Sequence, residues 1–196
     1  MSLFSPGYIP NLVLARKAFI GSNAAGAAIT IPIYSGTTPT FGLWNPAGSG
    51  VNVLLLQLNL GIAAEGSAVA STLGFAVTFN TGSAAATGSP LATFTRLSSG
   101  TFPSLIGDAG GATNNSAAQF SCASSGTTLT SAATLIPYNL GASNTAGASP
   151  AGALSLTFPI NGMVGLAPGT FISLVGNAAP VTTFYASLVW AEVPAS

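Results

Sequence analysis

The stretch that decides the fold is Val51-Asn-Val-Leu-Leu-Leu-Gln-Leu-Asn-Leu60. Four of its leucines fall at every second position and so share one face of an extended strand: Leu54, Leu56, Leu58 and Leu60. Val53 and Leu55 add apolar side chains to the opposite face. The pattern predicts a strand that is covered along the whole of one face and partly covered on the other.

Similar short runs continue along the chain, separated by clusters of turn residues. The predicted strands are 28–34, 41–44, 51–60, 73–79, 90–97, 117–122, 133–138, 154–158, 170–175 and 182–193. Turn residues gather in Asn45-Pro-Ala-Gly-Ser-Gly50 and in two long loops, 98–116 and 139–152. Because helical periodicity is nearly absent, we predict an all-β fold. Eight to ten short strands suit a two-sheet antiparallel sandwich, jelly-roll-like, and a barrel is the alternative.

The beginning of the chain differs from the rest. Pro6, Gly7 and Pro10 disfavour a long helix, so we expect an N-terminal arm over residues 1–20. A single β-sandwich domain is then expected over residues 21–196.

Two other structures are open for the second half of this arm. Residues 11–20 could form a short helix capped by Asn11, or residues 12–20 could form the first strand of the sandwich. The apolar run Leu12-Val-Leu14 has no obvious strand partner. We therefore expect the arm to dock on a neighbouring subunit, where these side chains would be buried.

The composition excludes most chemistry. The 196 residues include no His, one Cys (Cys122), three Lys or Arg and three Asp or Glu, and the formal net charge is zero. Without His there is no Ser-His-Asp triad and no imidazole ligand for a metal. One Cys provides neither a disulfide within the chain nor a cysteine-rich zinc site. We predict that the protein is not an enzyme and binds no cofactor or metal.

Nucleic-acid and membrane partners are not expected either. Three basic residues, Arg16, Lys17 and Arg96, cannot neutralise a run of phosphates. No apolar run approaches the roughly 18 residues of a membrane-spanning helix. The first residues lack the basic and apolar regions of a secretory signal peptide, which predicts synthesis in a cytoplasm.

The carboxylates and the aromatic residues are the remaining candidates for catalytic or binding sites. Glu65, Asp108 and Glu192 have no spacing that pairs two carboxylates across a glycosidic bond, so we expect polar surface roles for them. Asp108 with Asn114 and Asn115 offers too few charged ligands for Ca²⁺.

Four aromatic residues could stack on sugars, but alternating aromatic residues in a sandwich are expected to be core: Trp44, Tyr138, Tyr185 and Trp190. Gly48-Ser-Gly50 lacks the spacing of a nucleophile elbow and is predicted to be a turn.

The surface must be built almost without charge. Ala, Gly, Ser and Thr make up just over half of the chain, and only 3% of the residues are charged. A free monomer usually has a much more charged surface. A neutral surface of small residues loses little solvation when a partner covers it. The composition therefore favours assembly into a homo-oligomer or onto a larger shell.

Two parts of the chain resemble known proteins. Leu43-Trp-Asn-Pro-Ala-Gly-Ser-Gly-Val-Asn-Val53 resembles a strand–turn–strand segment of small β-rich virion proteins of tailed bacteriophages. Leu166-Ala-Pro-Gly-Thr-Phe-Ile-Ser-Leu174 and Leu188-Val-Trp-Ala-Glu-Val-Pro194 are similar to the closing strands of such proteins. These proteins are head decoration (cement) proteins, head fibres or tail components, commonly trimers. The resemblance implies a role on the particle without catalysis, and it carries over no site residues.

These observations predict a structural virion protein that binds the head surface and reinforces contacts between capsomers. Its expected partners are itself, as a homotrimer, and a major capsid protein. A head- or tail-fibre receptor-binding module is the alternative, and its long loops or exposed aromatic residues would hold a carbohydrate. A self-assembling jelly-roll capsid protein fits less well, because shells that package RNA usually have a basic arm and only Arg16 and Lys17 are present here.

Overall fold

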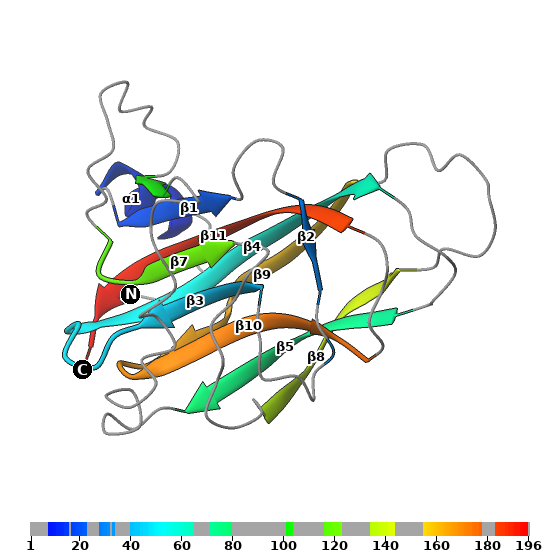
Figure 1. Ribbon diagram of the computed structural model, residues 1–196. Helices are drawn as coiled ribbons and strands as arrows, with labels where there is room; N and C mark the ends of the chain where they lie inside the picture. The colour runs from blue at the N-terminus through cyan, green and yellow to red at the C-terminus, as the bar shows by residue number, and fades with distance from the viewer. Residues whose placement is uncertain are drawn as a thin grey trace.

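The computed structural model describes residues 8–15, 17–22, 28–31, 33, 40–64, 71–79, 101–103, 116–122, 134–143, 155–177 and 183–195. These residues are mostly in β-strands, which form two antiparallel sheets (Figure 1). The prediction of an all-β architecture with two antiparallel sheets is confirmed at this level.

The first sheet has the strand order β6-β1-β11-β4-β9, and β2 also pairs with β11. Its strands are β1 (Ala18–Ser22), β2 (Ile29–Thr30), β4 (Val51–Ala64), β6 (Thr101–Pro103), β9 (Ser155–Leu166) and β11 (Thr183–Pro194). The long strands β4 and β11 pair along nearly their whole length, from Thr183 opposite Ala64 to Pro194 opposite Val51. They form the centre of this sheet.

The second sheet has the order β7-β3-β10-β5-β8. Its strands are β3 (Phe41–Asn45), β5 (Ser71–Phe79), β7 (Gln119–Cys122), β8 (Thr134–Ser143) and β10 (Thr170–Gly176). Every residue of the central strand β10 is buried. This agrees with its sequence, Thr-Phe-Ile-Ser-Leu-Val-Gly, in which apolar residues occupy both faces and only the small polar residues Thr170 and Ser173 stand among them.

Side chains from the inner faces of both sheets form a common core. Four aromatic rings connect the sheets at one end of it. Trp190 of β11 stacks against Phe19 of β1 and Phe120 of β7, at centroid distances of 6.0 and 5.9 Å, and Phe120 meets Phe41 of β3 edge to face at 5.2 Å. Each fully buried side chain of this size stabilises the fold by about 1.5–3 kcal/mol, so this stack holds β7 firmly on the core.

The predicted faces of β4 are only partly correct. Val53, Leu55, Leu58 and Leu60 all point into the core, although the simple alternation places the first two opposite the last two. The reason is a bulge. Both neighbours of β4 change register between Leu55 and Gln57, so Leu56 is an extra residue and the alternation shifts by one.

The N-terminal segment also differs from the prediction. Within the predicted arm, helix α1 covers Tyr8–Leu14, so Asn11 lies inside the helix and does not cap it. Strand β1 is hydrogen-bonded to β11, so the boundary predicted between residues 20 and 21 falls within a strand. Pro10 lies in the first turn of α1, where a missing N–H breaks no helical hydrogen bond, and so the helix tolerates it. Residues 1–7 lie outside the described part of the chain.

Several other predicted boundaries differ from those of the observed strands. The predicted strand 90–97 lies outside the described residues. Strand β6 lies within the predicted loop 98–116, and β8 continues to Ser143, into the predicted loop 139–152. In the predicted strand 28–34, Ile29 pairs with β11 whereas Ile33 bridges to Gly176 of β10, so the chain crosses from one sheet to the other.

Candidate functional site

The predicted surface role of Glu192 is wrong. Only 5% of this residue is exposed, and its carboxylate accepts three hydrogen bonds. The Ser116 hydroxyl and the Ala118 N–H donate to Oε1 at 2.5 and 3.0 Å, and the Ala117 N–H donates to Oε2 at 3.1 Å. These neutral donors replace the lost water contacts, so the carboxylate tolerates burial. It fixes the segment before β7 to β11.

Of the other predicted polar positions, the structure describes only Lys17. Glu65, Asp108, Asn114, Asn115, Arg16 and Arg96 all lie outside the described residues. Lys17 is exposed, and its backbone carbonyl accepts a 2.8 Å hydrogen bond from the Glu192 N–H. Among the residues that the structure describes, no three metal-binding side chains come together. Glu192 therefore has a structural role, because its carboxylate already accepts three hydrogen bonds.

The predicted turn at Gly48-Ser-Gly50 is confirmed, and a neighbouring residue that sequence reasoning missed holds it in place. Gly48 and Gly50 adopt the left-handed region, with φ of 80° and 71°. The amide Nδ2 of Asn45, which is fully buried, donates to the carbonyls of Val51 and Leu166 at 2.8 and 2.9 Å. Asn45 thereby connects the turn between β3 and β4 with the end of β9.

The four candidate aromatic residues lie at different positions in the two sheets. Trp190 is fully buried in the core, as predicted, and Trp44 is half-buried on β3. Tyr138 lies in β8. Tyr185 differs from the prediction, because 44% of it is exposed on the outer face of the first sheet. Its place in the alternation of β11 explains this, since Phe184 and Ala186 on either side point into the core.

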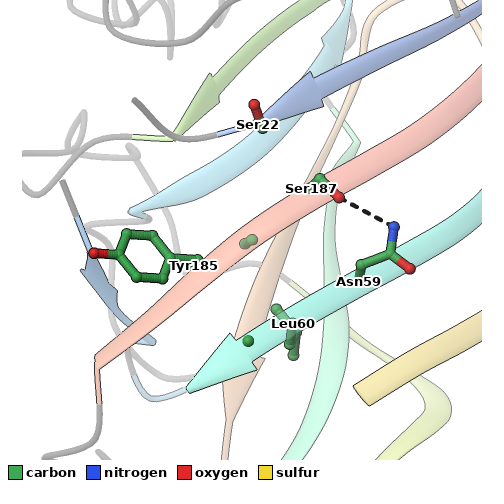
Figure 2. A pocket seen from close by; sticks show the side chains of 7 residues that line it. Ser22, Asn59, Leu60, Tyr185 and Ser187 are labelled. Carbon is green, nitrogen blue, oxygen red and sulfur yellow. Dashed lines mark hydrogen bonds between the residues drawn. The ribbon is translucent and has the colours of Figure 1, made fainter. Parts of the chain in front are cut away.

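A shallow hollow of about 240 Å³ lies beside Tyr185 (Figure 2). Ser22 of β1, Ser187 of β11 and Asn59 of β4 are opposite one another in the register, and Gly61 is opposite Tyr185. Since residues opposite each other in a sheet share a face, all five line the outer side. Leu60 and Ala186 also border the hollow, but both belong to the core.

Hydrogen bonds fix the polar side chains of this surface. Gln57 Nε2 donates to Asn59 Oδ1 at 2.6 Å, and Asn59 Nδ2 donates to the Ser187 hydroxyl at 3.0 Å. The dashed line in Figure 2 marks the second bond. Because the Ser187 oxygen accepts from Asn59, its own hydrogen is left to be donated elsewhere. The sequence signal for this site was the uncharged set Gln57, Asn59 and Ser187, at alternate positions of two strands.

The lining of the hollow determines which chemistry it supports. None of the described residues that line the hollow is charged, so their hydroxyl groups have no charged acid or base among these residues. It offers hydroxyl and amide groups beside an aromatic ring, which suits binding.

Comparison with known proteins identifies no family for this chain. None of the helices in the described ranges is long and apolar enough to cross a bilayer. No protein-family model matches the chain, and no curated protein or solved structure is detectably similar to it.

Proposed function

We propose that this chain is a structural virion protein: a decoration protein that binds a phage head as a homotrimer and reinforces capsomer contacts through a major capsid protein. The observation that carries the proposal is the strand order of the two sheets. Jelly-roll sandwiches recur in viral capsid and lectin domains. The proposal therefore includes a jelly-roll topology for this chain.

Nested pairing of the strands supports that topology. In chain order, the eight principal strands are β1, β3, β4, β5, β8, β9, β10 and β11. The first pairs with the last (β1 with β11), the second with the seventh (β3 with β10), the third with the sixth (β4 with β9) and the fourth with the fifth (β5 with β8). A long hairpin that wraps around a barrel-shaped core produces this nesting. The short strands β6 and β7 both come from the connection between β5 and β8 and extend one edge of each sheet.

The surface supports a role in assembly. Among the described residues, the outer face of the first sheet carries Ser22, Gln57, Asn59, Thr157 and Ser187, all uncharged. A capsid neighbour can cover the β9 side of this face, away from the hollow beside Tyr185, without stripping water from ions, which is the main cost of burying charged surfaces.

The N-terminal segment supports docking. Helix α1 has no buried residue, and 75% of its Leu14 is exposed. Apolar side chains gain about 25 cal/mol for each Å² that a neighbour removes from water. In this proposal, residues 1–20 are the arm that contacts the adjacent subunit, even though residues 18–20 also pair within the sheet.

The copy number on purified particles tests the proposal. Virions are banded on a density gradient, and the chain is quantified by mass spectrometry relative to the major capsid protein. A decoration protein is expected in a fixed ratio to the capsid protein, with one trimer per symmetry-related head position. A few copies per particle would indicate a fibre instead. Absence from the particles would overturn a virion role altogether.

A further inference from the structure

We propose that the hollow beside Tyr185 binds one ring of a neutral saccharide. This inference goes beyond the proposed virion role and does not depend on it. It rests on the outer face of the first sheet, where an exposed aromatic ring lies next to fixed amides and hydroxyls.

Open space beside Tyr185 gives the sugar room. The nearest position across the sheet is Gly61, and a Cβ placed there would meet no atom within 4 Å. A ring can therefore approach the backbone of β4 while one of its faces rests against Tyr185. The C–H groups on one face of a pyranose are apolar and complement an aromatic ring.

The polar groups match the hydroxyls of a sugar. Ser187 can donate outward because its oxygen already accepts from Asn59. The hydroxyls of Ser22 and Tyr185 have no hydrogen-bond partner among the described residues and can both donate and accept. The bond from Gln57 holds the Asn59 amide in one orientation, so the ligand need not order it.

Charge selects against other ligands. Among the described residues that line the hollow, there is no cation for a phosphate or carboxylate and no carboxylate for an amine. An acidic sugar or a phosphate would lose part of its hydration without gaining a counter-charge. An apolar ligand would cover hydroxyl groups without satisfying them. A neutral polyol with one apolar face avoids both costs.

The size of the hollow indicates a weak, single-ring site. Its volume of about 240 Å³ lies below the roughly 300–1,000 Å³ of sites that enclose drug-sized ligands. A ring held on one face gains little binding energy, so we expect a dissociation constant on the order of 1 mM for one copy. A trimer that presents three such hollows would strengthen attachment to a multivalent glycan surface.

Saturation-transfer difference NMR on the full chain tests the proposal directly. The probes are the methyl glycosides of glucose, galactose, mannose and N-acetylglucosamine, each at about 10 mM, ten times the expected dissociation constant. N-acetylneuraminic acid is the charged control. We expect transfer to at least one neutral glycoside, strongest at the C–H protons of one ring face, and none to the charged sugar.

Three variants connect the signal to the hollow. Tyr185→Ala removes the stacking ring and is expected to weaken binding at least about fivefold, whereas Tyr185→Phe keeps the ring and most of the affinity. Gly61→Val places a branched side chain in the open space, where its Cβ meets no atom within 4 Å, and should also weaken binding at least about fivefold. The matched control is Met163→Ala, which changes another exposed side chain of the same sheet, 65% exposed on β9, and should leave binding unchanged.

Unchanged melting temperatures would confirm that the variants fold. The proposal is overturned by the absence of transfer to every neutral glycoside, by equal transfer in Tyr185→Ala, or by stronger transfer to the charged sugar. The copy number on particles does not enter this test, so the failure of either proposal is recognised independently of the other.

Discussion

Glu192 and Asn45 are polar side chains buried near strand ends, and each connects segments that are far apart in the sequence. Glu192 holds the segment before β7, and Asn45 connects the start of β4 with the end of β9. Sheet ladders do not satisfy the backbone groups at these ends, so a side chain replaces the missing partner. A single sequence gives little sign of this, because a lone Glu in a strand has the pattern of a surface residue.

The variant Glu192→Gln should destabilise the fold by about 1–3 kcal/mol. Its amide oxygen can still accept from the Ala118 N–H, but its NH₂ group then faces the Ala117 N–H, and two buried donors meet without an acceptor. Ser116→Ala removes one donor and leaves the charge, so a smaller loss is expected. Urea denaturation measures both. Equal stability of Glu192→Gln and the parent protein would contradict the structural role.

Asn45→Ala should also cost about 1–3 kcal/mol, because the Val51 and Leu166 carbonyls would lose their side-chain donor. Asn45→Asp should cost more, since it places a carboxylate against two carbonyl oxygens. The control is Asn52→Ala. Asn52 is half-buried on β4, the next strand along the chain, and its substitution should leave the stability within about 0.5 kcal/mol of the parent. Equal melting temperatures for Asn45→Ala and Asn52→Ala would contradict the role of Asn45 in stabilising the turn.

At the scale of elements, the period of two located most of the strands but not their registers. The alternation identified β4, β5 and β11, because apolar side chains at every second position must face a core. It could not show the bulge at Leu56, because a bulge depends on how both neighbouring strands pair. Strand β6 has only three residues, too few to show a period, and it pairs with β1. Strand β7 lies within the predicted strand 117–122.

Close packing between strands gives a test at this scale. A Cβ on Gly42 of β3 would lie 2.4 Å from the Phe171 ring and 3.1 Å from the Ile172 carbonyl oxygen, both buried. Gly42→Ala should therefore destabilise the protein by about 1–3 kcal/mol. Gly61→Ala is the matched control, with no atom within 4 Å, and should be neutral or slightly stabilising. Thermal unfolding compares the two, and similar losses would show that Phe171 moves aside freely.

At the scale of the whole molecule, composition predicted more than any motif did. The absence of His and the scarcity of charge led us to expect neither catalysis nor nucleic-acid binding, and they favoured assembly. It could not locate the candidate site, because Tyr185 and Trp190 belong to the same strand and only the fold separates the exposed ring from the buried one. The site depends on three strands whose residues lie far apart in the sequence.

The same composition makes the solution state of the protein testable. We expect light scattering to give a trimer of about 57 kDa, three times the 19.1 kDa mass of one chain. With three basic and three acidic residues per chain, few ion pairs can contribute to the interface. Because salt weakens exposed ion pairs and leaves apolar and backbone contacts almost unaffected, the mass should stay constant from low to high ionic strength. A monomer under native conditions would contradict the expected assembly. A trimer that dissociates as salt rises would show instead that the few charged side chains, Lys17 among them, hold the subunits together.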